Sequence, residues 1–355
     1  MTVPTVGVEE EFLLVDPESG RPRAVSHLAL ASDAAPELAG ELQREQVETA
    51  TRPCATLDEL GAELRRARAA AATAAMAAGA ELAALATSPL AVDPTIAPSP
   101  RYQEMRRRFG LTAAEELTCG CHVHVAVDSD DEGVAVLDRI RPWLAPLLAL
   151  TANSPFWQGV DSGYASYRSQ VWQRWPSAGA YAPFGSADAY HATVRAMVDS
   201  ATVLDPGMMY FDARLSADHP TLEVRVADVC LDVDDAVLLA ALVRGLVGTA
   251  VRDWRAGTPA DPVRLELLRL AAWRAARSGV RGKLLDPGSW RPRPAEKVLD
   301  RLVAHVTPAL EDAGDLGYVR ALLAEVLERG TGAQAQRDAG DPRAAVALAV
   351  RRTRG

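Results

Sequence analysis

Lysine and asparagine are nearly absent from this 355-residue sequence, and aromatic residues make up only 5% of it. Lys283 and Lys297 are the only lysines, so arginine supplies nearly all of the positive charge. Acidic residues still outnumber basic ones by 47 to 38, which gives a net charge of -9. This balance argues against a general binder of nucleic acid or of anionic membranes. We therefore expect a protein that acts on small molecules.

Signals for secretion and for membrane insertion are missing as well. Four cysteines are too few for a disulfide framework in a chain of this length. The opening MTVPTVGVEEEF has neither the basic nor the apolar segment of a signal peptide. The most apolar helical stretch, residues 236–251, is interrupted by Arg244 and is short for a bilayer. The sequence therefore predicts a cytoplasmic protein without a membrane span.

Common phosphate-binding and catalytic signatures are also lacking. The sequence contains no GxxxxGK[ST], GxSxG, HExxH or GxGxxG motif. If the protein uses ATP, its phosphates are not held by a P-loop. Metal ions and arginines would then neutralise the triphosphate, and the planar guanidinium suits this because it can bind phosphate through two hydrogen bonds.

Strands and helices are both predicted, in an order typical of an α+β protein with a substantially antiparallel sheet. The capping-box spacing of Thr56 and Glu59 predicts the start of an Ala-rich helix. We expect a single domain over residues 1–355, in which about 290–355 form a C-terminal helical extension. The predicted strands are 6–15, 42–54, 117–127, 209–216 and 221–228; the predicted helices are 56–86, 130–152 and most of the chain from 232 onward.

Polar pairs mark three of these strands. Side chains alternate between the two faces of a strand, so Glu9 and Glu11 share a face, as do His122 with His124 and Glu223 with Arg225. Carboxylates gathered on one buried face repel each other and require cations. Oxygen-rich sites suit Mg2+ or Mn2+, and the latter tolerates an imidazole ligand. The sequence therefore predicts a divalent metal site that could hold phosphates.

Other interpretations of these pairs stay open from the residues alone. The run of acids at 9–11 could be a solvated edge, although its apolar flanks favour a central strand. Cys119, Cys121 and His122 could form a zinc site, although no second spaced ligand pair accompanies them. Glu223 and Arg225 could be an ordinary ion pair within a strand.

Six segments, taken together, resemble the carboxylate-amine ligase family related to glutamate-cysteine ligase, of the glutamate-cysteine ligase 2 type, within the glutamine-synthetase-like superfamily. They cover most of the chain and occur in the family's order. The segments are GVEEEFLLVD (7–16), VETATRPC (47–54), CGCHVHVAVD (119–128), ANSPFWQGVDSGYASYRS (152–169), TLEVRVAD (221–228) and WRAARSG (273–279). One departure is Arg52, which stands between Thr51 and Pro53 where relatives usually run from Thr directly into Pro.

This resemblance implies a glutamine-synthetase-like catalytic fold, in which a curved, mainly antiparallel sheet forms a funnel backed by helices. ATP and Mg2+ or Mn2+ are the implied cofactors, and the implied reaction joins a glutamate-like carboxylate to the amine of cysteine or another amino acid through an acyl phosphate. It implies no nucleic-acid or membrane partner, and it leaves a homodimer open. Rival readings are a ligase for a different amine, a phosphotransferase of the same fold, a zinc hydrolase and a nucleotide-binding regulator.

The resemblance also assigns roles to individual residues. Arg225 and Arg168 are the implied catalytic residues, and Arg168 would hold a substrate carboxylate or a developing phosphate. Trp273 and Arg277 would lie near the site. The implied metal ligands are Glu9, Glu11, Glu48, His122 and Glu223, with Glu41 as an addition; the implied nucleotide contacts are His124, Arg225 and Asn153, the only asparagine of the chain.

Overall fold

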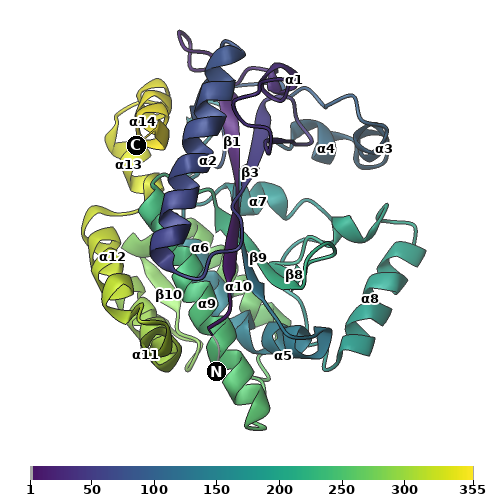
Figure 1. The fold of residues 1–355 in the computed structure, drawn as a ribbon, viewed down its shortest axis with the longest axis vertical. Helices are drawn as coiled ribbons and strands as arrows, with labels where there is room; N and C mark the ends of the chain where they lie inside the picture. Colours follow the sequence, from purple (N-terminus) through teal and green to yellow (C-terminus); the bar gives the residue numbers. More distant parts are fainter. Residues whose placement is uncertain (1–2, 355) are drawn as a thin grey trace.

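The computed structural model describes residues 3–354 and contains one central sheet of seven strands (Figure 1). The strands follow the order β2-β3-β1-β5-β9-β8, β4 pairs with β1, and every pairing is antiparallel. The predicted α+β class with an antiparallel sheet is confirmed, and the sheet is open. Its strands are β1 (Val6–Val15), β2 (Ala39–Gly40), β3 (Gln46–Ala50), β4 (Glu81–Ala83), β5 (Gly120–Ala126), β8 (Ala213–Leu215) and β9 (Thr221–Asp228).

Strand β1 lies in the middle of this sheet. It pairs with β3 on one side and with β5 on the other. Val6, Val8 and all residues from Phe12 to Val15 are buried, because one face of the strand packs on helices and its second half is covered on both sides. The solvated-edge interpretation of the acids at 9–11 is therefore wrong, and the central position predicted from their apolar flanks is confirmed.

Long helices cover the face of the sheet that turns away from Glu9 and Glu11. Helices α2 (Leu57–Ala77) and α9 (Val233–Arg255) lie against β1, and α6 (Leu144–Leu150) lies against β9. α2 begins with the predicted capping box of Thr56 and Glu59. It ends at Ala77, earlier than predicted, because Gly79 adopts a left-handed conformation (φ 71°) that turns the chain into β4. Helices α5 (Asp130–Ile140), α10 (Leu265–Ser278), α11 (Ala295–Ala313) and α12 (Leu316–Arg329) complete this layer.

The last part of the chain packs against its first part. Helix α14 (Pro342–Arg354) follows α13 (Gly332–Asp338) and lies against β4 and α2. The Thr353 hydroxyl accepts a hydrogen bond of 2.8 Å from the Ala84 N–H. Before these helices, β10 (Lys283–Leu285) and β11 (Pro292–Pro294) form a small hairpin that the sequence did not reveal. The division into one catalytic domain with a C-terminal helical extension stays a prediction.

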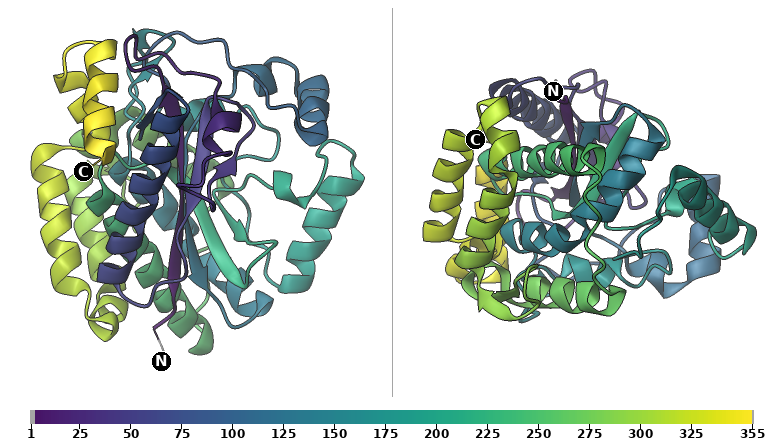
Figure 2. Two further views of the ribbon diagram at one scale, coloured as in Figure 1. Left: turned by 45° about the horizontal axis from the view of Figure 1, so that its top comes forward. Right: turned by 90° about the horizontal axis from the view of Figure 1, so that it is seen from below.

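An arm projects from the polar face of the sheet (Figure 2). We define it as α3 (Pro100–Phe109), α4 (Leu111–Glu115) and α8 (Ala187–Asp199). A separate apolar cluster, which includes Met105, Trp175 and Tyr210, joins the arm to the segment between 172 and 211. Helix α7 (Arg168–Trp172) lies against β9 and α10, and the short strands β6 (Phe156–Trp157) and β7 (Val160–Asp161) pair with each other. None of the helices in residues 3–354 combines the length and the apolar character needed to span a bilayer.

Candidate active site

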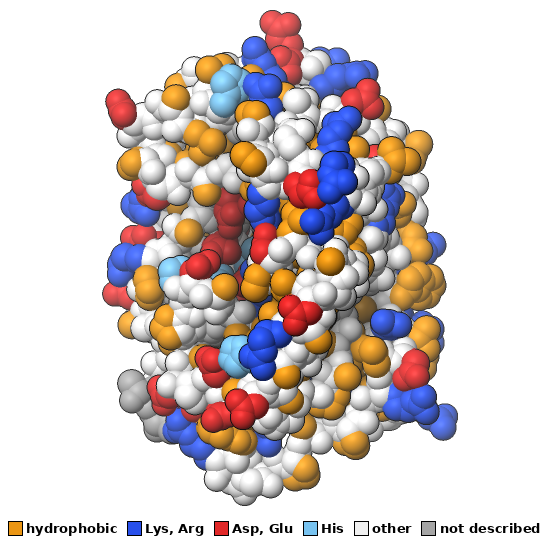
Figure 3. All heavy atoms as spheres, turned by 90° about the vertical axis from the view of Figure 1, so that its right-hand side faces the viewer, with side chains coloured by type: hydrophobic (Ala, Val, Ile, Leu, Met, Phe, Trp, Pro, Cys, Tyr) orange, Lys and Arg blue, Asp and Glu red, His pale blue; other side chains and the backbone are white. Residues whose placement is uncertain are grey.

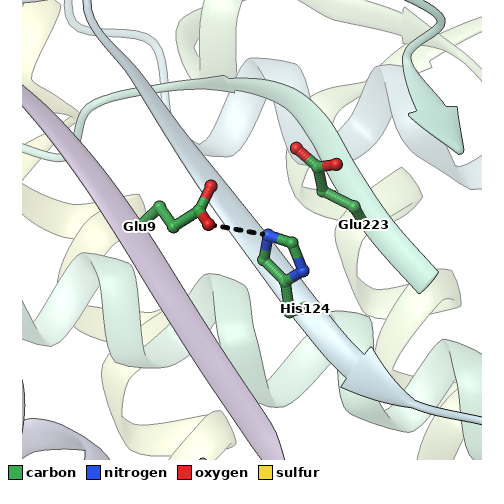
Figure 4. Close-up of side chains that lie close together, drawn as sticks. All are labelled: Glu9, His124 and Glu223. Carbon is green, nitrogen blue, oxygen red and sulfur yellow. Dashed lines mark ion pairs between the residues drawn. The ribbon is translucent and has the colours of Figure 1, made fainter. Parts of the chain in front are cut away.

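Three neighbouring strands bring the predicted polar pairs onto one face. In the register of β1 and β5, Glu9 lies opposite His122, and in that of β5 and β9, His124 lies opposite Glu223. Glu11 lies opposite Glu48 across β1 and β3. Figure 4 shows Glu9, His124 and Glu223 converging from β1, β5 and β9. The structure thus confirms the alternation of side chains along these strands that the sequence predicted.

A β-bulge adjusts the middle of this face. Cys121 lies opposite Ala227 and Val123 lies opposite Val224, so two residues of β9 oppose His122 alone. One of the two is Arg225. Such bulges redirect side chains, and they are common beside active sites. Here the Arg225 guanidinium points to the polar face, where Nη1 lies 3.5 Å from His122 Nδ1 and donates a hydrogen bond to Glu223.

A cavity of about 300 Å³ opens between this polar face and the arm. Figure 3 looks onto this side of the molecule and shows acidic side chains in a hollow, with histidine beside them. The lining combines carboxylates, arginines and aromatic rings. The charged and aromatic lining residues are Glu9, Glu11, Glu41, Glu48, Glu116, Arg101, Arg214, Arg225, His122, Tyr102, Trp172, Trp175 and Tyr210.

Two sets of side chains on this face are arranged so that they could each hold a cation. Glu9, His124 and Glu223 form one set and Glu9, Glu48 and His122 form the other, with ligand atoms within 4.8 Å of one another in each set. Glu9 Oε1 lies 3.3 Å from His124 Nε2, and Glu9 Oε2 lies 3.4 Å from His122 Nδ1. The buried His122 Nε2 has no hydrogen-bond partner among residues 3–354. These carboxylate and imidazole donors fit Mg2+ or Mn2+.

The protonation of the carboxylates differs between the two sides of this face. Burial disfavours the charge of Glu223, but Arg225 and Arg214 outweigh it and hold its pKa at about 2. Burial likewise opposes ionisation of Glu9, but hydrogen bonds to His122 and His124 hold its pKa well below the usual range. On the other side, burial and the neighbouring Glu41 raise the pKa of Glu11 to about 7 and that of Glu48 well above its ordinary value. Arg168 and Arg225 lower the pKa of Glu11 less than burial and Glu41 raise it, so additional positive charge on the Glu11 side would favour the ionised carboxylates.

Arg168 lies buried behind the cavity at the start of α7. Its side chain is only 2% exposed, and its Nε has no hydrogen-bond partner among the described residues. The ring of Trp172 lies between two guanidinium groups, 5.6 Å from that of Arg168 and 5.9 Å from that of Arg225. Such contacts are attractive and are stronger away from water. Trp172 thus helps to position the two arginines that the sequence singled out as catalytic.

The missing side chain of Gly120 leaves room for the Arg168 guanidinium. A Cβ atom at Gly120 would lie 2.3 Å from Arg168 Nη2, a distance that no real Cβ contact reaches. Replacing Gly120 by alanine should therefore displace the guanidinium. We expect a loss of activity of at least about 10-fold, because even a small misplacement of a positioning group is costly. The overall fold should be kept, since the clash involves the movable end of a side chain.

Steady-state kinetics together with circular dichroism check this expectation. The matched control is Gly110→Ala: Gly110 also joins two elements, and nothing lies within 4 Å of its hypothetical Cβ. Its positive φ of 54° makes some loss of stability there expected, but no loss of activity in the folded protein. Unchanged kinetics in Gly120→Ala would show that the Arg168 guanidinium is free to move without consequence.

Several residues that the resemblance placed at the site lie elsewhere. The Asn153 side chain donates hydrogen bonds to the Ala84 and Val229 carbonyl groups and accepts one from Gln336. It does not line the cavity, and its hydrogen-bonding groups are already used within the protein. This packing gives Asn153 a structural role, whereas the resemblance implied a nucleotide contact.

The WRAARSG helix also faces away from the cavity. The Trp273 indole donates a hydrogen bond to the Tyr164 hydroxyl, and Arg277 donates one to the Gly163 carbonyl. Neither residue lines the cavity. Arg52, the departure from the family pattern, points toward Glu63 at 3.3 Å, while Thr51 keeps its hydrogen bonds to Val8. The departure therefore leaves the metal-ligand face unchanged.

The cysteines do not gather around His122. Alternation along β5 places Cys121 on the opposite face, in the main apolar core, and Cys119 lies in a second apolar cluster. Burial raises the pKa of the Cys119 thiol well above its ordinary value. Neither set of potential metal ligands found in residues 3–354 contains a cysteine. The structure therefore does not support a zinc site built on these thiols.

Some cavity residues were missed in the sequence. Arg214 lies opposite Glu223 across β8 and β9 and donates a hydrogen bond of 2.7 Å to it. The sequence did carry a signal for Arg214, because the predicted strands 209–216 and 221–228 place it beside the strand of Glu223. Trp172, Tyr102 and Glu116 gave no comparable signal, because their positions depend on how the arm packs.

The chain is similar to known proteins in both sequence and fold. A family model described as glutamate-cysteine ligase family 2 matches residues 5–347. "Putative glutamate--cysteine ligase 2-1" of Streptomyces avermitilis is 55% identical, with 99% of each chain covered, and "Putative glutamate--cysteine ligase 2" of Streptomyces coelicolor is 54% identical over 98% of this chain and 99% of its own. Among solved structures, a glutamate-cysteine ligase from Francisella tularensis in complex with AMP has a TM-score of 0.72 at 14% identity, covering 100% of this chain and 90% of that one. The Pup ligase PafA has a TM-score of 0.58 at 14% identity, covering 95% and 68%.

Proposed function

The chain belongs to glutamate-cysteine ligase family 2, and from this premise we propose that it is an ATP-dependent ligase that joins the γ-carboxylate of glutamate to an amine. The observation that carries the proposal is the polar face of β1, β5 and β9, where carboxylates, histidines and Arg225 converge. Cysteine is the first acceptor to test, because the similar proteins are named as putative glutamate-cysteine ligases. A cytoplasmic location and a dimeric state are part of the expectation and rest on sequence alone.

Divalent cations are part of the proposal. Glu9, Glu48 and His122 would hold one and Glu9, His124 and Glu223 another, with Glu11 beside them. When bound, Mg2+ or Mn2+ supplies positive charge that neutralises phosphate oxygens. The carboxylates of this face fit that use because additional positive charge would favour their ionised form on the Glu11 side.

The chain's own residues then position the reactants. In the first step, a γ-carboxylate oxygen attacks the γ-phosphorus of ATP, the bond to the bridging oxygen breaks, and ADP leaves. Arg225, fixed by Glu223 and by the Trp172 ring, is placed to neutralise charge on the transferred phosphoryl group. Arg168, buried and without an ion pair among the described residues, is suited to a carboxylate or phosphate oxygen of the substrate.

The second step forms the amide. The acceptor nitrogen attacks the acyl carbon, phosphate leaves, and the nitrogen loses a proton. Water would hydrolyse an acyl phosphate, so the site has to exclude it. Helix α3 of the arm lines the cavity with Tyr102 and Met105, and the rings of Trp172, Trp175 and Tyr210 line it beside the arm, which limits access of water to the reacting groups.

The test is ADP release by the purified protein with ATP, Mg2+ and L-glutamate, with and without L-cysteine or another amine. We expect turnover only when both the carboxylate and the amine are present. Chelation by EDTA should abolish turnover and excess Mg2+ or Mn2+ should restore it, since Arg214 and Arg225 are already paired with Glu223 and the remaining carboxylates of the face depend on added cations. Turnover that persists in EDTA, or that needs no amine, would contradict the proposal.

A further inference from the structure

One buried carboxyl group of the cavity is not used by this mechanism. Glu116 lies just before β5, on the side of Gly120 that is farther from His122 and His124. It lines the cavity together with Glu11 and Glu48 and is only 5% exposed. Gln46, also in the lining, donates a hydrogen bond of 2.7 Å to the Thr118 carbonyl and so fixes this end of the cavity. Glu116 is therefore placed beyond the metal-ligand face and not within it.

Half of the Glu116 carboxyl group is unsatisfied. Its Oε1 accepts a hydrogen bond from the Thr118 hydroxyl, but Oε2 has no partner among residues 3–354. The indole of Trp175 is close enough to lower the pKa of this carboxyl group, but the contact falls short of a hydrogen bond, since Oε2 and the indole Nε1 both lack one. A buried acceptor without a partner costs free energy in the protein alone, and its presence in a substrate cavity indicates a ligand that donates to it.

The charges around Glu116 favour a cation. Burial raises its pKa to about 7, against the Thr118 hydrogen bond and the more distant charges of Arg168 and Arg174. Arg174 is held by Glu115 at 2.8 Å, and Arg168 forms no ion pair with Glu116. A positively charged ligand would supply the missing partner and keep the carboxylate ionised.

The other arginines that line the cavity do not form ion pairs with Glu41, Glu48 or Glu116 either. Arg101 is paired with Asp205 at 2.8 Å, and both Arg214 and Arg225 are paired with Glu223. Glu41, Glu48 and Glu116 thus face the cavity without an arginine partner among the described residues. Metal ions account for Glu48 and its neighbours on β1, but Glu116 lies outside both sets of potential ligands.

Aromatic rings complete this end of the cavity. Trp172 and Trp175 pack against Tyr210, with ring centroids 4.8 and 5.5 Å away, and Tyr102 lies beside Glu41, which together with burial raises its pKa to about 12. Ring faces attract ammonium groups. Guanidinium groups already lie over Trp172 and Tyr102, so Trp175 and Tyr210 are the rings that could take this role. Cysteine offers a thiol and a carboxylate, and neither matches this chemistry.

We propose that this end of the cavity selects an acceptor amine that carries a second cationic group, and that Glu116 is the residue that recognises that group. The inference rests on the proposed ligase function. The first nitrogen of the acceptor forms the amide as described above, with loss of phosphate and a proton. The second stays charged, binds the Glu116 carboxylate and takes no part in bond making.

The test compares two acceptors that differ by the second amino group, 1,4-diaminobutane and butylamine, in the ADP-release assay with L-glutamate. We expect a kcat/KM at least about 10-fold higher for the diamine. Glu116→Gln should remove this preference by raising KM for the diamine, with kcat and the butylamine kinetics little changed, and Glu116→Asp should restore part of it. Glu104→Gln, a change at a half-buried carboxylate on α3 that does not line the cavity, is the matched control.

Each result bears on the inference. Equal use of the two amines by the wild type, turnover with cysteine but not with the diamine, or an equal loss for both amines in Glu116→Gln would overturn it and leave the ligase function standing. If no carboxylate and amine pair gives turnover, the ligase proposal fails, and calorimetric titration with 1,4-diaminobutane in Mg2+ decides the inference. Binding by the wild type that Glu116→Gln loses would uphold the site, and no binding by the wild type would refute it.

Discussion

Replacing Glu11 or Glu223 by glutamine is expected to lower glutamate- and amine-dependent ADP release by about 100-fold or more. Either change keeps the size of the side chain and removes a charge from the face that would hold the cations and the triphosphate. Loss of a single ligand or of charge stabilisation typically has an effect of this order. The measurement is steady-state ADP release over a range of Mg2+ concentrations.

The two variants should differ in stability, which separates the loss of activity from unfolding. Burial and Glu41 already disfavour the charge of Glu11, so Glu11→Gln should keep or raise the melting temperature. Glu223 is held ionised by Arg225 and Arg214, so Glu223→Gln leaves two arginines without their carboxylate and should lower it. Glu104→Gln should change neither property. Full activity in both variants would rule out the assigned metal-ligand face.

Replacing Arg68 by methionine is expected to destabilise the protein by about 3–5 kcal/mol, because it leaves a buried charge without a partner. Arg68 on α2 and Glu10 on β1 are fully buried and bond through Nε at 2.9 Å and Nη2 at 2.6 Å. Arg68 also donates to the Cys230 and Leu231 carbonyl groups. Glu10 points to the helix-covered face, so this pair has a structural role, unlike its neighbours on β1.

Thermal and urea unfolding measure this effect. Arg66→Met is the matched control on the same helix, since Arg66 is half exposed and its pairs with Glu37 and Glu63 lie at the surface. It should change the free energy of unfolding by no more than about 1 kcal/mol. The double change Glu10→Leu with Arg68→Met should recover most of the lost stability. A loss in Arg68→Met no larger than in Arg66→Met would show that Glu10 accommodates itself by taking a proton.

Local patterns allowed the sequence to predict the centre of the site. Alternation along a strand is a property of the backbone, so the shared faces of Glu9 with Glu11 and of His122 with His124 followed from spacing alone. The apolar flanks of the acids likewise predicted that β1 is central. Antiparallel pairing then placed β3, β1, β5 and β9 side by side.

Long-range packing set the rest, and no local pattern encodes it. The bulge opposite His122 depends on how β5 and β9 fit together. The hydrogen bond that gives Asn153 its structural role comes from Gln336, 183 residues away. The helix predicted to reach residue 86 stopped early because one glycine, in an alanine-rich run that favours helix throughout, takes a left-handed conformation. The sequence predicted a short basic helix before residue 117, which is α3, but not that it packs over the cavity at Glu116.

During synthesis, β1 leaves the ribosome well before the strand that flanks it on one side. Strand β5, the partner on that side, begins only at Gly120, and β9, which pairs with β5, begins at Thr221. Until β5 is made, β1 therefore has an unpaired edge, although its valines and leucines are buried in the folded protein. Unpaired apolar strands of this kind associate with their own copies. Three successive carboxylates in the middle of β1 make such pairing repulsive. We therefore expect the residues that gather cations in the folded enzyme to act earlier as a guard against aggregation of the growing chain.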